Sequence, residues 1–283
     1  MSREQQIYSF VLLLAPTEHV VVGATAGHQA HAAFLHTIEE VDPTLSALLH
    51  APGVSTRPFT VSPLRGLGRP RAGQVQLAPG RECWLRFTAL DPAIYQRFMA
   101  RFLSGAAPVL RLGPAAFLVK EIRTTPGSHP WAGYSSWWEL ADRARPEPEV
   151  ALRFCSPTAF GFGQHAWGKK IAVLPDPVPV FSSLLRAWNN LAPPALQMDR
   201  GPLLAYLEEH VVIKRLERLR TEMLHYARSP QVGFVGEATY GLMADDEGAR
   251  LQLNTLAAFA FYAGVGMKTT MGMGQVRRLS DAR

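Results

Sequence analysis

Hydrophobic and polar positions along the first fifty residues predict a buried strand followed by a helix. Residues 7–14 are rich in β-forming apolar side chains and stop before Pro16, which is typical of a buried strand. Helical spacing follows in residues 27–50, where apolar residues recur every three or four positions at Ala30, Phe34, Ile38 and Val41. Pro43 breaks this helix, because proline has no N–H donor and restricts the residue before it. Residues 44–50 are therefore predicted to form a separate helical turn.

The same patterns continue through both halves of the chain. In the first half they predict an extended segment, a basic loop, a strand, a helix and a strand, at residues 57–64, 65–79, 83–90, 92–103 and 116–124. The loop carries Arg65, Arg69 and Arg71. In the second half they predict strands at residues 149–160, 231–243 and 275–279, and helices at residues 181–192, 201–219 and 253–266. Each half therefore offers strands on either side of helices.

Residues 125–149 are rich in proline and glycine, which is typical of a domain boundary. The chain has 283 residues, 47% of them hydrophobic, which is enough for two domains of ordinary size. We expect an α+β fold of two tandem ferredoxin-like (RRM-like) domains, with antiparallel sheets backed by helices. The expected domains span residues 1–140 and 148–283. No sequence repeat supports the duplication.

Charge and cysteine content narrow the possible partners. The net charge is +6 and the isoelectric point is near 9.6, which favours a polyanionic partner. Cys83 and Cys155 are far apart and lack metal-ligand spacing, so we expect a reduced, cytoplasmic protein with no metal and no cofactor. The apolar run at residues 10–15 is too short for a signal peptide or a membrane span.

The segment "AGVGMKTTMGMGQVRR", residues 263–278, combines four glycines with a lysine. Glycines let backbone N–H groups approach an anion, and Lys268 adds positive charge. The nucleotide-binding P-loop does not fit, because its glycine and lysine spacing and its following helix are missing. Two readings stay open from the residues alone, a phosphate-binding loop or a pair of tight turns before a basic tail.

Several segments in the same order resemble the CRISPR-associated endoribonucleases of the Cas6 family, which cut repeat RNA into guide units. The matching segments are "VDPTLSALLH", "RPFTVSPL", "FCSPTAF", "VGFVGEATY" and "AGVGMKTTMGMGQVRR". The resemblance spans nearly the whole chain and implies two tandem ferredoxin-like domains. It also implies that the C-terminal loop lies against RNA, with Gly264, Gly266, Lys268, Gly272 and Gly274 near the phosphates.

The resemblance and the residues together indicate catalytic candidates. RNA is cleaved without metal when the 2′-hydroxyl is deprotonated and the leaving 5′-oxygen is protonated, and histidine suits both roles. His50 occupies the position where the family commonly carries its catalytic histidine, and His36 lies near a second functional position. His28 and His31 are further candidates, with a surface or capping role as the alternative for every histidine. Arg57 is the candidate for stabilising the phosphate, with a solvated arginine as the alternative.

Lys169 and Lys170 lie in an expected loop with Trp167, and we predict that these lysines bind RNA. An aromatic side chain among cations can stack on a base, although Trp167 is more typical of a packing residue.

The function expected from all this is metal-independent cleavage of CRISPR repeat RNA, leaving 2′,3′-cyclic phosphate and 5′-hydroxyl ends. The first alternative is an inactive repeat-RNA-binding subunit of a CRISPR effector complex. The second alternative is a nucleotide-hydrolysing enzyme, which the absent P-loop spacing disfavours. The expected partners are repeat RNA, other effector subunits and a second copy of the chain, with no membrane.

Overall fold

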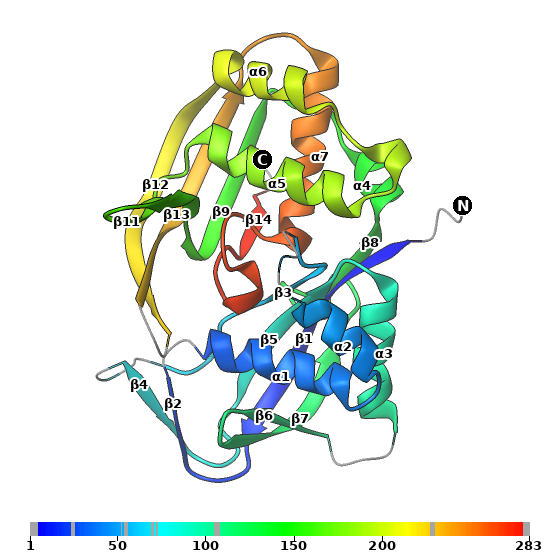
Figure 1. Cartoon of the computed structure of the whole chain (residues 1–283), viewed down its shortest axis with the longest axis vertical. Coiled ribbons are helices and arrows are strands. Elements are labelled where there is room, and N and C mark those ends of the chain that lie inside the picture. Colours follow the sequence, from blue (N-terminus) through cyan, green and yellow to red (C-terminus); the bar gives the residue numbers. More distant parts are fainter. Residues whose placement is uncertain are drawn as a thin grey trace.

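The computed structural model describes residues 5–23, 26–51, 53, 56–68, 71, 73–104, 108–226 and 230–279. Six antiparallel strands form an N-terminal sheet in the order β3-β5-β1-β7-β6, with β8 beside β1 (Figure 1). These strands are β1 (Gln6–Pro16), β3 (Phe59–Val61), β5 (Cys83–Ala89), β6 (Val109–Leu112), β7 (Ala115–Arg123) and β8 (Gly133–Ser136). The helices beside them are α1 (Gly27–Glu39), α2 (Pro43–His50) and α3 (Pro92–Leu103).

A four-stranded antiparallel sheet forms the C-terminal half, in the order β12-β13-β9-β14. Its strands are β9 (Glu149–Thr158), β12 (Val211–His225), β13 (Pro230–Leu242) and β14 (Val276–Arg278). The accompanying helices are α4 (Trp137–Arg143), α5 (Pro177–Leu191), α6 (Arg200–His210), α7 (Glu247–Ala263) and the short η1 (Pro194–Leu196) and η2 (Thr269–Met271). Two smaller ladders pair β2 (Val20–Gly23) with β4 (Gln74–Leu77), and β10 (Phe160–His165) with β11 (Gly168–Ala172).

Both halves have the same connectivity. In the N-terminal half the core strands β1, β3, β5 and β7 lie in the order second, third, first, fourth along the sheet. In the C-terminal half β9, β12, β13 and β14 lie in that same order. A helical segment follows the first strand and another follows the third in each half. This is the ferredoxin-like arrangement, which confirms the predicted fold class.

Aspartate caps explain where most of the longer helices begin. A carboxylate oxygen at the N-cap accepts a hydrogen bond from a backbone N–H of the first turn, which would otherwise lack a partner. The capping residues are Asp42 in α2, Asp91 in α3, Asp176 in α5, Asp199 in α6 and Asp246 in α7. Proline follows the aspartate in α2, α3 and α5, where its fixed φ angle suits the first helical position. The helix boundaries near residue 43 therefore follow directly from the sequence.

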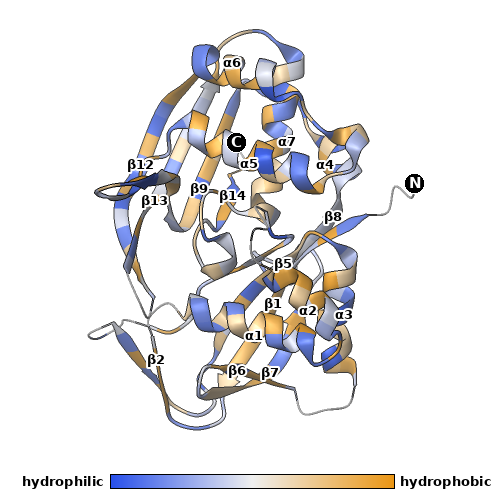
Figure 2. Cartoon of the chain, in the orientation of Figure 1, coloured by the Kyte–Doolittle hydropathy of each residue, from blue (hydrophilic) through white to orange (hydrophobic). Residues whose placement is uncertain are grey.

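Each half has its own hydrophobic core. In the N-terminal half, Phe10, Phe34, Phe87 and Phe98 pack ring against ring between the sheet and its helices. In the C-terminal half, Trp137, Trp188 and Phe259 do the same. Helices α1, α2 and α3 carry both hydrophobic and hydrophilic residues, as expected for helices that bury one face (Figure 2). Trp137 and Trp138 are the first two residues of α4, and Trp137 is 1% exposed.

A buried arginine joins the two halves. Arg86 on β5 donates hydrogen bonds to Ser9 Oγ at 2.7 Å, to Gln275 Oε1 at 2.6 Å and to the carbonyl oxygen of Phe261. Its guanidinium carbon lies 4.7 Å from the ring of Trp131 and 4.5 Å from the ring of Phe261. Burial of this cation lowers its pKa to about 9. Arg86 therefore ties the N-terminal sheet to the segment that follows α7.

The structure corrects three predicted elements. Lys169 and Lys170, expected in a loop, lie on strand β11, which pairs with β10. Residues 211–219 belong to strand β12, whereas the sequence analysis extended a helix through them. Val211, Val212 and Ile213 are β-branched and favour a strand, and pairing with β13 supplies the backbone hydrogen bonds. Part of the expected basic loop forms strand β4, and Arg65 Nη2 donates to the carbonyl oxygen of Cys155 at 2.6 Å. Arg69 lies outside the described residues.

Among the described residues, no helix is both long enough and apolar enough to cross a membrane.

Candidate active site

The glycine-rich loop after α7 meets helix α1 and strand β3 near the N-terminal end of α1. The glycine-rich segment after α7, residues 264–274, contacts α1 and β3 through η2 (Figure 1). Gly27 begins α1, and a Cβ there would lie 2.2 Å from the carbonyl oxygen of Met271. Only glycine therefore allows the loop to lie this close to the helix. Helix α2 is held to α1 by the Ser46 hydroxyl, which donates to the carbonyl oxygen of Leu35 at 3.1 Å.

His31 faces this glycine-rich loop. Its Nδ1 lies 3.0 Å from the carbonyl oxygen of Thr270, and its ring stacks on Phe59 with centroids 5.7 Å apart. A carbonyl oxygen only accepts hydrogen bonds, so His31 Nδ1–H is the donor in the neutral ring. This contact leaves Nε2 as the unprotonated nitrogen. The tautomer is therefore fixed in the form that a general base needs.

Burial lowers the pKa of His31 below its usual value, and this is the largest effect on the ring. The Thr270 carbonyl oxygen opposes it and raises the pKa. Electrostatic interaction with Arg57, His28 and His50 lowers the pKa of His31 further. The structure thus brings three histidines and one arginine close enough to interact, and it favours neutral His31 at neutral pH.

Arg57 lies in the cavity beside this cluster. The cavity has a volume of about 300 Å³ and is also lined by Gly264, Gly266, Lys268 and Arg186. Arg57 Nη2 donates to the carbonyl oxygen of Ala51 at 3.3 Å. Arg57 Nη1 is buried and has no hydrogen-bond partner among the described residues. An unpaired buried donor is costly, so an anionic oxygen that reached this nitrogen would be bound favourably.

His50 is the last residue of α2, and its side chain is exposed. The residue after it, Ala51, receives the Arg57 hydrogen bond, so His50 and Arg57 are held near one another by the backbone. His50 thus lies at the open side of the cluster, where solvent and a large substrate have access. His28 is also exposed, one turn before His31 on α1.

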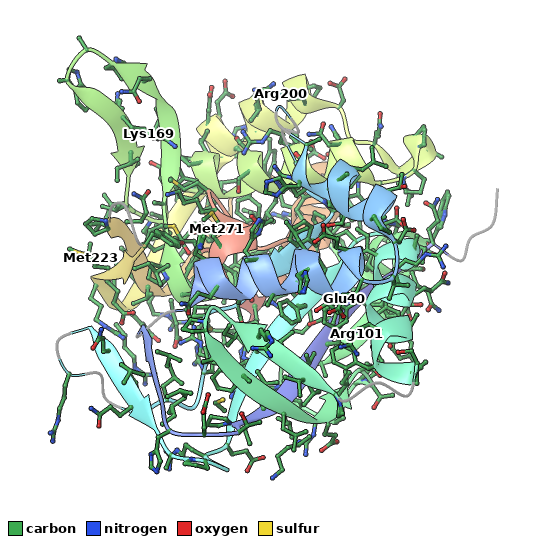
Figure 3. All side chains as sticks on the ribbon, turned by 60° about the horizontal axis from the view of Figure 1, so that its bottom comes forward. Glu40, Arg101, Lys169, Arg200, Met223 and Met271 are labelled. Carbon is green, nitrogen blue, oxygen red and sulfur yellow. The ribbon has the colours of Figure 1, made fainter. Side chains whose placement is uncertain are left out.

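The structure does not bring His36 to this cluster. His36 is five residues after His31, which places it about 140° around the helix. Its ring nitrogens lie 3.4 Å from carboxylate oxygens of Glu39 and Glu40, and 61% of its side chain is exposed. It lines a different cavity with Arg101, on the side of α1 where Glu40 and Arg101 are labelled in Figure 3. His36, expected from the sequence to be catalytic, therefore lies outside the cluster of His31, His28, His50 and Arg57.

The four predicted RNA-binding glycines lie in a compact loop whose backbone packs on itself and on β9. The backbone φ angles are positive at Gly264, Gly266, Gly272 and Gly274, which favours glycine. A Cβ at Gly274 would lie 2.2 Å from the carbonyl oxygen of Val265, and one at Gly266 would lie 2.5 Å from that of Ala159. The glycines are thus required by the loop's own packing. Gly264 and Gly266 also line the Arg57 cavity.

Lys268 projects from the same loop. Its Nζ lies 4.8 Å from the ring centroid of Tyr226, whose hydroxyl donates to the carbonyl oxygen of Met271 at 2.9 Å. Burial lowers the pKa of Lys268, and the positive charge of Lys169 lowers it further. Lys169 and Lys170 are neighbours on β11 and point to opposite sides of that strand. Lys169 lines a cleft beside α5, and Lys170 Nζ lies 6.0 Å from the ring of Phe162.

The sequence favoured His36 over His31 as a catalytic residue and did not indicate a role for Arg186. The spacing of His28 and His31 places both on one helix face, which is the signal that points to them. Arg186 is an exposed arginine on α5 with no distinctive motif around it. In the parts of the chain that the structure describes, no group of three His, Cys, Asp or Glu side chains is placed to hold a metal ion.

Comparison with known proteins gives a consistent result for both halves. The family described as "CRISPR Cas6 N-terminal domain" matches residues 6–142, and "CRISPR-associated endoribonuclease Cas6" matches residues 152–276. No curated protein matches the chain in sequence.

Solved structures of Cas6 proteins match nearly the whole chain. A product complex of Cas6 (TTHB231) is 29% identical, with a TM-score of 0.83 over 97% of this chain and 100% of that one. The Thermus thermophilus Cas6 (TTHB231) is 28% identical, with a TM-score of 0.70 over 97% and 99%. A product complex of Cas6 (TTHA0078) is 29% identical, with a TM-score of 0.74 over 97% and 100%. With both family descriptions and these structures in agreement, the chain belongs to the Cas6 family of CRISPR-associated endoribonucleases.

Proposed function

We propose that this protein cleaves CRISPR repeat RNA by metal-independent attack of a 2′-hydroxyl on the adjacent phosphorus. The observation that carries the proposal is that His31 and Arg57 lie close enough to interact electrostatically. His31 has a fixed tautomer with Nε2 free, and Arg57 offers a buried donor without a partner. A base beside a phosphate-binding cation is what 2′-hydroxyl attack requires. Membership of an endoribonuclease family supports the same reaction.

In this mechanism His31 Nε2 accepts the proton of the 2′-hydroxyl as its oxygen bonds to phosphorus. Arg57 donates to a non-bridging oxygen of the phosphate, where negative charge grows as five bonds form at phosphorus. His50, protonated at the open side of the cluster, gives a proton to the departing 5′-oxygen. The P–O5′ bond breaks, and the products are a 2′,3′-cyclic phosphate and a 5′-hydroxyl.

RNA binding in this proposal uses the cations around the same cavity. Lys268 and Arg57 line it with Gly264 and Gly266, and Lys169 extends the positive charge toward β11. Lys170 and the remaining glycines, Gly272 and Gly274, stay predicted contacts from the sequence. Structures of related Cas6 proteins as product complexes support an RNA ligand here. Association with effector subunits and dimer formation stay predictions.

A cleavage assay in EDTA tests the proposed function. The purified protein is incubated with the repeat RNA of its own CRISPR array, in excess EDTA, and the product ends are mapped. We expect one site-specific cut with a 2′,3′-cyclic phosphate and a 5′-hydroxyl, at the same rate with and without EDTA. Binding without cleavage would instead support the repeat-binding subunit. Loss of cleavage on chelation would remove the metal-independent mechanism.

A further inference from the structure

Strands β10 and β11 form a hairpin that pairs with no other strand in the described part of the chain. His165 pairs with Gly168 at its end, so Ala166 and Trp167 form the tip. Figure 3 shows the hairpin, on which Lys169 is labelled, standing away from the body of the protein. Lys169 pairs with Gln164, next to the tip. An element this exposed is free to contact a large ligand.

The tip carries an exposed aromatic pair. Trp167 is 71% exposed, and its ring stacks on His165 with centroids 5.0 Å apart and 5° between the planes. Tryptophan is seldom this exposed in a folded protein, because its large apolar surface favours burial. His165 orients the Trp167 ring and covers part of one face. The high exposure leaves ring surface available for another flat group.

Cations line the cleft between this hairpin and α5. The cleft has a volume of about 720 Å³, and Lys169, Arg186 and Arg200 lie around it with polar residues such as Ser182. No carboxylate in the described residues forms an ion pair with any of the three cations. Such a lining suits phosphates better than an apolar protein surface.

The cleft continues to the candidate active site. Arg186, Ser183, Gly266 and Met267 line both this cleft and the cavity that holds Arg57. A chain of phosphates that leaves the Arg57 cavity therefore passes Arg186 before it reaches Lys169 and the hairpin. The ligand class that combines regularly spaced phosphates with flat stacking groups is a nucleic acid.

We propose that Trp167, oriented by His165, is a stacking site for an unpaired RNA base, and that the α5 cleft holds the phosphates between this base and the cleavage site. This inference rests on the proposed function, because RNA is the ligand in both. Stacking on an aromatic ring needs a base whose face is open, so the site binds a loop or single-stranded base and not a base pair. The contact lies outside the Arg57 cavity, so it adds affinity without changing the chemical step.

Two substitutions separate stacking from simple packing. Trp167→Ala removes the ring, and we expect it to weaken binding of the array's repeat RNA by about 5- to 150-fold, the range measured for loss of one stacked base. Trp167→Phe keeps an aromatic face and should stay within about threefold of wild type, since phenylalanine also stacks on bases. A stacked RNA base quenches tryptophan fluorescence, so Trp167→Phe should also lose part of the RNA-dependent quenching. Tyr134→Ala on β8, which removes a 46% exposed aromatic from the N-terminal sheet, is the matched control and should bind as wild type.

The assay uses the full chain, with affinity measured by titration and the cleavage rate measured at saturating protein. Wild-type affinity of Trp167→Ala for repeat RNA would overturn the proposal. The proposal would also be overturned if Trp167→Ala weakened binding to a blunt RNA duplex, which has no unpaired bases, as much as binding to repeat RNA. Conversion of a protein dimer to a monomer by Trp167→Ala in the absence of RNA would overturn it as well. The cleavage rate reports the proposed function separately. A protein that binds repeat RNA through Trp167 but never cuts it would refute catalysis and leave the stacking site standing.

Discussion

Replacing His50 by alanine is expected to slow single-turnover cleavage of repeat RNA by about 10²- to 10⁴-fold, the usual contribution of a proton-transfer group. His31→Ala is expected to lose a similar factor. In the proposed mechanism His31 accepts a proton through Nε2, and exposed His50 donates one. His50 is exposed, whereas His31 also contacts Thr270 and Phe59, so circular dichroism must show that His31→Ala keeps its fold. Arg57 and Lys268, the cations proposed to hold the phosphates, are unchanged in both variants. RNA affinity should therefore stay within about threefold in both variants.

His36→Ala is the matched control, because it removes a histidine from the same helix on the side away from the cluster. It should cut at the wild-type rate. The pH dependence gives an independent readout, since a general base acts only when unprotonated. Because the pKa of His31 is lowered from 6.5, the wild-type cleavage rate should begin to fall only below pH 6.5 as the pH is decreased. Full activity in both His31→Ala and His50→Ala, or loss of activity in His36→Ala, would contradict this assignment.

Replacing Arg57 by alanine is expected to slow cleavage at saturating protein by about 10²- to 10³-fold, as found when one donor to a developing oxyanion is removed. The reason is that Arg57 lines the shared cavity and that its buried Nη1 has no partner among the described residues. Arg57→Lys should recover part of the rate, because lysine keeps the charge but not the forked geometry. The measurement is the single-turnover rate constant at saturating protein.

Arg111→Ala on β6 removes an exposed arginine from a different cavity and controls for the lost charge. Circular dichroism confirms folding, because Arg57 also donates to Ala51 at the end of α2. If Arg57→Ala and Arg111→Ala lower affinity equally and leave the rate at saturation unchanged, Arg57 contributes only general electrostatic attraction.

Local chemistry in the sequence determines much of the fold. The break at Pro43 was predictable because Asp42 caps the helix and proline fixes its first position. The strand at residues 211–219 was not, because its apolar residues are spaced so that a helix and a strand are both compatible with them. Pairing with β13, the next strand in the chain, decides the outcome. Tertiary pairing of this kind leaves little trace in a local pattern.

The candidate site was only partly predictable for a related reason. His31 and His36 lie on one helix, and the sequence alone does not tell which face meets the glycine-rich loop. That choice depends on Gly27, which lets Met271 approach α1, some 240 residues away in the chain. The loop glycines were expected to make room for RNA, whereas the structure shows that Gly266 and Gly274 first make room for neighbouring carbonyl groups. Long-range packing thus determines both the histidine and the loop.

A single 2′-deoxy nucleotide at the cleavage site tests the central claim most directly. The full chain is mixed with repeat RNA in which only the nucleotide 5′ of the scissile phosphate lacks its 2′-hydroxyl. Because that oxygen is the proposed nucleophile, we expect cleavage to be abolished while the affinity for this RNA stays near that for the all-ribose RNA. A 2′-deoxy substitution one nucleotide further away should leave cleavage intact. Cleavage of the singly deoxy-substituted RNA at the original site would contradict 2′-hydroxyl attack.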